Sequence, residues 1–129
     1  MVEDYTLHMG PHRVVGRDGN YRRAAERQFG QYPGLGFTVH DLLTNGDRIA
    51  LRFSEHGRSA RMGSCAVWGG ISTYRWDGER LTECWVEQDY YARRRQLDAG
   101  ISNPVEPPAI DPWSSGPEAA EANCEAAVT

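Results

Sequence analysis

Residues 37–56 read FTVHDLLTNGDRIALRFSEH, and this stretch decides the fold class. At its centre, Asn45-Gly46-Asp47 stands between two apolar runs, and Asn-Gly in that setting is typical of a β-hairpin turn. In the second run every other residue from Ile49 to Phe53 is apolar, which is the pattern of a strand with one buried face. The sequence therefore predicts an antiparallel hairpin with strands at residues 37–44 and 48–56.

Two more strands are predicted after this hairpin. Residues 65–76 form the third strand, in which Gly69-Gly70 permits a bend or bulge. Asp77-Gly78 then marks another tight turn, and residues 80–91 form the fourth strand. The four strands together predict an antiparallel meander.

One helix is predicted before the meander in the sequence and another after it. Asn20 can cap a helix over residues 21–29, whose apolar residues share one face, and Gly30 ends it. A short arginine-rich helix is expected at residues 92–99, closed by Gly100. Residues 1–20 are rich in turn signals and are predicted to be irregular. The expected fold class is α+β, with a helix packed against a curved antiparallel sheet.

The chain of 129 residues is long enough for one domain, which we assign to residues 1–100. Five prolines follow Gly100, and the end of the chain is rich in alanine and glutamate. Residues 101–113 are therefore predicted to form an extended arm, and residues 114–129 an acidic and largely disordered tail.

Composition excludes several functions. All 14 basic residues are arginine, so Schiff-base chemistry and a Walker-type phosphate loop have no lysine to use. No basic face is clustered enough for nucleic-acid binding. No apolar run reaches the ~18 residues of a membrane span, and the first residues do not resemble a signal peptide. We expect a cytoplasmic protein that binds neither nucleic acid nor membrane.

The cysteines and histidines do not indicate a metal site. Cys65, Cys84 and Cys124 make an odd number without Cys-x-x-Cys spacing, which argues against a disulfide framework and a zinc site. Cys65 and Cys84 stand in apolar strand-like runs, where a thiol usually packs as a small core residue. We expect neither a metal nor a cofactor.

The fourth strand carries the strongest functional pattern. Side-chain alternation puts Glu83, Trp85, Glu87 and Asp89 on one face. This face is either a solvated outer surface with one tryptophan or the wall of a pocket. In a pocket, burial and neighbouring like charge would raise the pKa of a carboxyl group toward neutrality, as acid/base chemistry next to a carbonyl requires.

Several segments resemble the SnoaL-like polyketide cyclases of the nuclear transport factor 2-like superfamily. They are Asp4-Tyr5-x-x-His8, Gly16-Arg17-x-Gly19 before a helix, Tyr32-Pro33-Gly34-Leu35 before a strand, Asn45-Gly46-Asp47-Arg48-Ile49-Ala50, Tyr74-Arg75-x-Asp77-Gly78, and Leu81-x-Glu83-x-Trp85-x-x-x-Asp89. Their order and spacing over residues 4–97 are similar to those of the family.

The resemblance implies a cone-like, strongly curved sheet around a pocket. Family members include cyclases, isomerases, dehydratases, hydrolases and non-catalytic binders, so the fold alone does not choose a function. The family usually has two helices before the segment that matches Asp4-Tyr5-x-x-His8, and this sequence begins close to that segment. Either the natural chain starts further upstream, or the pocket is closed in another way, for which the arm after Gly100 and a second subunit are the candidates.

The resemblance also implies site residues. It turns the Asp89 face inward and makes Asp89 the general acid or base, with Glu87 where relatives can have a histidine and His8 at the pocket mouth. Substrate-binding candidates are His40, which lies within a strand, the aromatic residues Trp68, Tyr74 and Trp85, and Arg52, which could pair with a carboxylate.

Two functions remain open. The first is a cofactor-independent acid/base enzyme of the cyclase, isomerase, dehydratase or hydrolase type, acting on a small apolar carbonyl or polyketide-like substrate. The second is a non-catalytic small-molecule-binding or dimerisation module. A homodimer is expected in either case, because curved sheets of this kind leave an apolar outer face.

Overall fold

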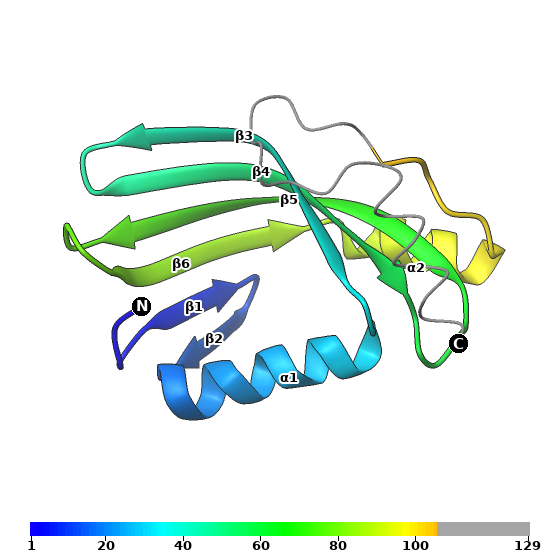
Figure 1. Ribbon diagram of the computed structural model, residues 1–129, viewed down its shortest axis with the longest axis horizontal. Helices are drawn as coiled ribbons and strands as arrows, with labels where there is room; N and C mark the ends of the chain where they lie inside the picture. Colours follow the sequence, from blue (N-terminus) through cyan, green and yellow to red (C-terminus); the bar gives the residue numbers. More distant parts are fainter. Residues whose placement is uncertain (106–129) are drawn as a thin grey trace.

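The computed structural model describes residues 1–105 of the chain. They form a six-stranded sheet of order β2-β1-β6-β5-β4-β3 that does not close into a barrel (Figure 1). The strands are β1 Thr6–Met9, β2 His12–Val15, β3 Gly36–Asn45, β4 Arg48–Arg58, β5 Cys65–Trp76 and β6 Leu81–Gln88. The helices are α1 Arg22–Gln31 and α2 Tyr90–Ala99, and a π-helical segment, Arg17–Tyr21, leads into α1. The predicted α+β class is confirmed.

The central meander is confirmed. β3, β4, β5 and β6 pair antiparallel in sequence order, and Asn45 pairs with Arg48 around the predicted hairpin turn. The bulge that Gly69-Gly70 would permit does not occur in the pairing of β4 with β5, which keeps one register throughout. Gly70 instead makes room for a ring, because a Cβ atom there would lie 2.5 Å from Cζ of Phe53.

The first 20 residues differ from the prediction. They contain the β1–β2 hairpin, whose turn is the Met9-Gly10-Pro11 segment, and are not irregular. β1 also pairs with β6 in parallel, so the sheet is mixed and not wholly antiparallel. β1 and β2 are only four residues long, too short for a clear alternation. The pairing of β1 with β6 joins segments more than 70 residues apart. Local sequence patterns do not carry that information.

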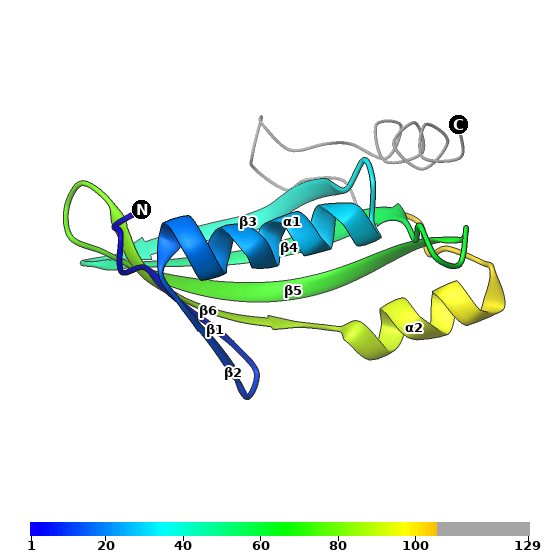
Figure 2. The ribbon, with the colours of Figure 1, turned by 90° about the horizontal axis from the view of Figure 1, so that it is seen from below.

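Helix α1 lies on the concave side of the sheet (Figure 2). The helix continues through the predicted stop signal Gly30 and ends at Gln31. Asn20 does not cap it, because the Asn20 side chain donates a hydrogen bond to the Val15 carbonyl. At its two ends Tyr21 packs edge-on against Tyr5, and Tyr32 packs against Trp68. In Figure 2 the helix runs along the strands, while β1 and β2 lie obliquely to β5.

The side of the sheet that contacts α1 and its flanking residues is called the inner face, and the opposite side the outer face. Strand alternation and pairing place these residues on the inner face: Leu51, Phe53, Glu55, Trp68, Ser72, Tyr74, Cys84 and Val86. They supply two buried clusters, one around Tyr5, Phe53, Cys84 and Val86 and the other around Tyr32, Ala66, Trp68 and Leu97.

β6 ends at Gln88, three residues before the predicted end of the strand, and α2 begins at Tyr90, two residues before its predicted start. Asp89 is the cause, because its side chain accepts a hydrogen bond from the Ala92 amide and caps the helix. α2 then runs beside the free edge of β5, where the Gln96 amide bonds the Val67 main chain. No helix within residues 1–105 is long and apolar enough to cross a membrane.

The expected arm and tail begin at residue 101. Residues 101–105 have no regular secondary structure, and the remainder of the predicted arm and tail lies outside the described residues.

Candidate functional site

Glu55 on β4 is a buried carboxyl group on the inner face. It is 8% exposed, and its Oε2 accepts a hydrogen bond of 3.0 Å from Nε2 of Gln28 on α1. Burial raises the pKa of Glu55 from 4.5 to about 7, against the opposing effects of the Arg93 charge and the Gln28 hydrogen bond. A carboxyl group of this kind can both accept and donate a proton near neutral pH.

Aromatic rings surround the neighbouring cation. The guanidinium of Arg93 on α2 lies 5.1 Å from the Tyr32 ring centre, 5.2 Å from that of Trp68 and 4.6 Å from that of Tyr90. Such contacts are favourable, because the ring faces are electron-rich. They fix a positive charge close to the carboxyl group of Glu55, which lowers the cost of its ionisation.

The polar atoms around the site are held in place. The indole N–H of Trp68 donates to Oε1 of Gln88 at 2.9 Å and also lies close enough to Glu55 to lower the pKa of its carboxyl group. The hydroxyl group of Tyr90 contacts the Met9 sulfur at 3.3 Å, which joins α2 to the end of β1. Burial raises the pKa of Tyr90, so its hydroxyl stays protonated at neutral pH.

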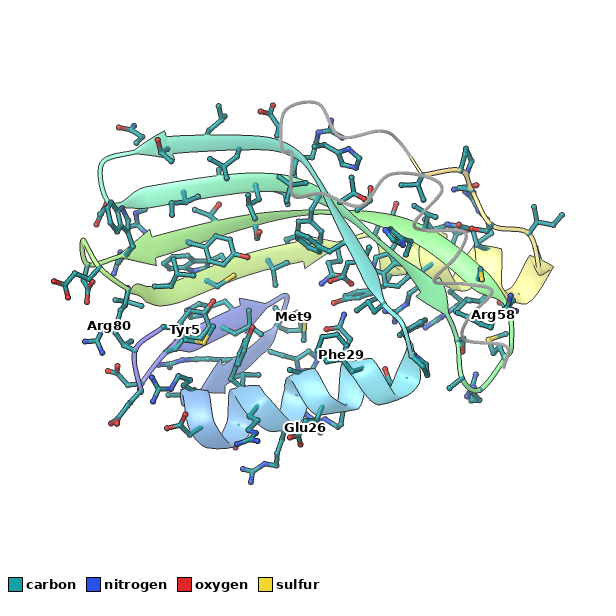
Figure 3. The ribbon with its side chains drawn as sticks, in the orientation of Figure 1. Tyr5, Met9, Glu26, Phe29, Arg58 and Arg80 are labelled. Carbon is teal, nitrogen blue, oxygen red and sulfur yellow. The ribbon has the colours of Figure 1, made fainter. Side chains whose placement is uncertain are left out.

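Apolar side chains lie next to Glu55 on the inner face. Phe37 stacks on Phe53, with ring centres 4.8 Å apart. Phe29 on α1 is 58% exposed and lies on the side of the helix nearest Met9, whereas Glu26 points the other way (Figure 3). The surroundings of Glu55 thus combine one carboxyl group with several apolar surfaces, as small-molecule sites commonly do.

A cavity of about 500 Å³ opens beside this cluster, between the end of α1, the β4–β5 connection and α2. Arg93, Tyr32 and Tyr90 line it, and Glu55 does not. Its other polar lining residues include Arg61, Arg94 and Asp98.

The acidic face of β6 lies on the outer face, because Cys84 and Val86 occupy the inner face. His8 pairs with Glu83 at 2.5 Å and stacks on Trp85, with ring centres 5.2 Å apart and an angle of 7° between the planes. The guanidinium groups of Arg48 and Arg75 also lie over Trp85. The inward orientation that the family resemblance implied for this face is therefore corrected.

A second cavity, of about 790 Å³, gathers four of the predicted residues, counting Trp68. Arg52, Glu87 and Asp89 line it, together with Trp68 and the backbone of Gly69 and Gly70. Asp89 is exposed and serves as a helix cap, in place of the expected burial beside Trp85. The catalytic roles expected for Asp89, Glu87 and His8 stay predictions.

Tyr74 and His40 lie away from this cavity, whereas Trp68 both lines it and contacts Arg93. Trp68 lies in the Arg93 cluster, 1% exposed. Tyr74 is on the inner face at the far end, where burial raises its pKa to about 12 and it accepts a hydrogen bond from Ser72. His40 occupies the bulge between Val39 and Asp41, is 1% exposed, and bonds Ser54 at 2.7 Å on the outer face.

Sequence reasoning missed Glu55, Gln28, Tyr32 and Arg93. A signal for Glu55 was present, since the alternation of Ile49, Leu51 and Phe53 continues to position 55 and puts a carboxyl group on an apolar face. The other three come from helices or loops and reach the site only through tertiary packing. Within residues 1–105 no three His, Cys, Asp or Glu side chains group closely enough to hold a metal ion.

Comparisons with known proteins agree with the observed fold. The family model described as SnoaL-like domain matches residues 1–84. No curated protein matches the chain. Among solved structures, a candidate polyketide cyclase from Acidithiobacillus ferrooxidans superposes with a TM-score of 0.69 at 19% identity, covering 78% of this chain and 79% of that one.

Two other structures are similar. IdmH, a candidate polyketide cyclase from Streptomyces antibioticus, has a TM-score of 0.66 at 17% identity and covers 76% of this chain and 81% of its own. A protein with a ketosteroid isomerase-like fold from Catenulispora acidiphila, in complex with trimethylamine, has a TM-score of 0.61 at 15% identity, covering 67% of each chain. At these identities the likeness shows the fold.

Proposed function

Because this chain belongs to the SnoaL-like domain family, we propose that it is a cofactor-independent acid/base enzyme acting on a small, largely apolar carbonyl or polyketide-like compound, with Glu55 as the acid/base group. The observation that carries the proposal is the Glu55 carboxyl group, 8% exposed on the inner face, with a pKa raised to about 7 by burial. About half of such groups are ionised at neutral pH, so both protonation states are available.

The chemistry follows from these two states. Ionised Glu55 removes a proton from the carbon next to a carbonyl group, and negative charge develops on the carbonyl oxygen. Protonated Glu55 then returns the proton, to the oxygen or to another carbon of the same substrate. Gln28 positions the carboxyl group through its amide hydrogen bond, and the cation of Arg93 stabilises the negative charge that develops.

The apolar surroundings favour a flat substrate. Phe37 and Phe53 are stacked on the inner face, and Tyr32, Trp68 and Tyr90 surround Arg93. Aromatic walls of this kind suit ring compounds, because ring stacking adds to the burial of apolar area.

A second position for the acid/base group is Asp89, in the cavity that also contains Arg52 and Glu87. A carboxylate and a guanidinium on one cavity wall favour it. Glu55 is favoured over Asp89, because Asp89 is exposed and its carboxylate caps α2 through the Ala92 amide.

A non-catalytic small-molecule-binding module is the second candidate function. The observation that favours it is the cavity of about 500 Å³, whose walls include Arg93 and Tyr90 but not Glu55. In that case the cavity would hold a ligand without a carboxyl group placed to react with it. The homodimer and the cytoplasmic location expected from the sequence remain part of the proposal in either case.

Hydrogen–deuterium exchange separates these possibilities. The protein is incubated with the ketone tetralone in deuterated buffer, and loss of the α-proton is followed by proton NMR. We expect the wild-type protein to exceed the buffer rate, Glu55→Gln to return to it, and Asp89→Asn to stay near wild type. Exchange that survives Glu55→Gln and is lost in Asp89→Asn would transfer the role to Asp89. If no simple ketone exchanges faster than in buffer, the binding module is favoured.

A further inference from the structure

Within residues 1–105, Arg93 has aromatic contacts but no polar side-chain partner. Its guanidinium contacts Tyr32, Trp68 and Tyr90, and its side chain makes no hydrogen bond or ion pair with any other residue in the described range 1–105. A guanidinium has five N–H donors in its plane. The contacts with the rings are not hydrogen bonds to polar atoms, so these donors can serve a ligand in the cavity that Arg93 lines.

The charges of this cavity favour an anion. Arg61, Arg93 and Arg94 line it, and Asp98 is the acidic residue on its wall. Glu55 interacts with the charge of Arg93 without a direct ion pair and is absent from the cavity wall, so the described wall carries three arginines and one acidic residue. The volume of about 500 Å³ is in the range of sites that hold small organic molecules.

The ring contacts also pre-position the cation. A free arginine side chain loses rotamer freedom when it binds a carboxylate, and this loss weakens surface ion pairs. Tyr32, Trp68 and Tyr90 have already restricted the Arg93 side chain before a ligand arrives. A carboxylate in the cavity can then accept two parallel hydrogen bonds from one guanidinium, the geometry that arginine favours.

We propose that Arg93 binds a carboxylate group of the ligand, so that the protein prefers aromatic or polyketide-like acids over neutral ketones of the same size. This inference rests on the proposed function for the identity of the compound as a substrate, but the binding preference is measurable without turnover. The remainder of the acid would lie against Tyr32 and Tyr90, which share the cavity wall with Arg93.

Fluorine NMR of two matched probes tests the inference. Trifluoromethylbenzoate carries the carboxylate, and trifluoromethylacetophenone replaces it with a neutral ketone. Dissociation constants for both are measured with the wild-type protein, Arg93→Gln, Arg95→Gln and Glu55→Gln. Arg95 is the matched control, because it lies two residues along the same helix, is exposed and is not part of the cavity wall.

We expect the wild-type protein to bind the benzoate about five to ten times more tightly than the ketone. Arg93→Gln should abolish this preference, Arg95→Gln should keep it, and Glu55→Gln, which removes a negative charge near Arg93, should keep or strengthen it. Equal affinity of the wild-type protein for both probes would overturn the inference. An equal loss of the benzoate preference in Arg93→Gln and Arg95→Gln would also overturn the inference. That result would mean that the preference comes from the net charge of the protein and not from a site at Arg93.

The two proposals fail separately. A benzoate preference that depends on Arg93, without any ketone exchange, supports the anion site and removes the enzymatic role. Ketone exchange that depends on Glu55, without a benzoate preference, supports the enzyme and removes the anion site.

Discussion

Gln28 on α1 donates a hydrogen bond of 3.0 Å to the carboxyl group of Glu55 on β4, 27 residues further along the chain. This bond joins the helix to the inner face of the sheet at its one strongly perturbed carboxyl group among the described residues. It stabilises the ionised form and lowers the pKa of Glu55, whereas burial raises that pKa by more. The pKa of Glu55 is therefore a balance of burial against polar contacts, and substitutions can move it in a known direction.

Removing the Gln28 amide should raise the pKa of Glu55 further. In Gln28→Ala the carboxylate loses its side-chain donor while remaining buried, so its ionised form becomes more costly. Carbon NMR of labelled glutamate carboxyl groups would show the Glu55 midpoint above that of the wild-type protein. Gln31→Ala is the control, since Gln31 is an exposed glutamine at the end of the same helix. An unchanged or lowered midpoint in Gln28→Ala would disprove this account of the hydrogen bond.

Glu55 should make the protein less stable at higher pH. Its pKa is about 7 in the folded chain and 4.5 ordinarily, so between these values the folded chain holds a proton that the unfolded chain has released. The free energy of unfolding therefore falls as the pH rises through this window, by about 3 kcal/mol in total. Urea unfolding at about pH 5 and about pH 8 measures the loss.

Glu55→Gln should flatten the dependence of the unfolding free energy on pH. Glu26→Gln is the control and should leave it unchanged, because Glu26 is exposed on α1 and pairs with Arg22. Burial lowers the pKa of His56, which gives a slope of the opposite sign in all three proteins, so the difference between them isolates Glu55. Equal pH slopes in wild type and Glu55→Gln would show that Glu55 ionises normally.

Asp89 should matter more for stability than for proton transfer. Its carboxylate accepts the Ala92 amide at the start of α2, so Asp89→Ala should lower the free energy of unfolding by about 1 kcal/mol. Asp89→Asn keeps a capping oxygen and should be nearly as stable as wild type. Thermal unfolding compares the two variants. If Asp89→Asn lowers the free energy of unfolding as much as Asp89→Ala does, the contribution of Asp89 comes from its charge and not from capping the helix.

Two glycines give opposite predictions for the same substitution. A Cβ atom at Gly36 would lie 1.9 Å from Cε1 of His56, a buried ring on the paired strand, so Gly36→Ala should cost about 2–3 kcal/mol. Gly30 lies within α1 and a Cβ there meets nothing within 4 Å, so Gly30→Ala should stabilise by about 0.5–1 kcal/mol. Urea unfolding of both variants tests the two predictions. A Gly36→Ala protein as stable as wild type would contradict the close packing of His56 against Gly36 of β3.

The meander was predictable because its signals are local. Asn45-Gly46-Asp47 and Asp77-Gly78 specify turns, and the alternation of Ile49, Leu51 and Phe53 specifies a strand with two different faces. The β1–β2 hairpin is local, but its strands of four residues are too short for a clear alternation. The parallel pairing of β1 with β6 depends on contacts distant in sequence, and no local pattern encodes it.

The candidate site was only partly predictable, because alternation defines two faces of a strand without saying which one is covered. On β6 the small residues Cys84 and Val86 pack inward with Tyr5, and the larger Trp85 stacks with His8 outside. Trp68 was predicted and lies in the cluster around Arg93. Glu55 follows from the pattern of β4 once α1 is known to cover its face.

The ionisation of Glu55 is the central claim, and its carboxyl carbon reports it directly. The protein is labelled at the glutamate side-chain carboxyl carbons and titrated by NMR, with Glu55→Gln identifying the signal. The account predicts a midpoint of about 7 for Glu55. A midpoint near the ordinary 4.5 would contradict it, because Glu55 would then be fully ionised at neutral pH and have no proton to donate.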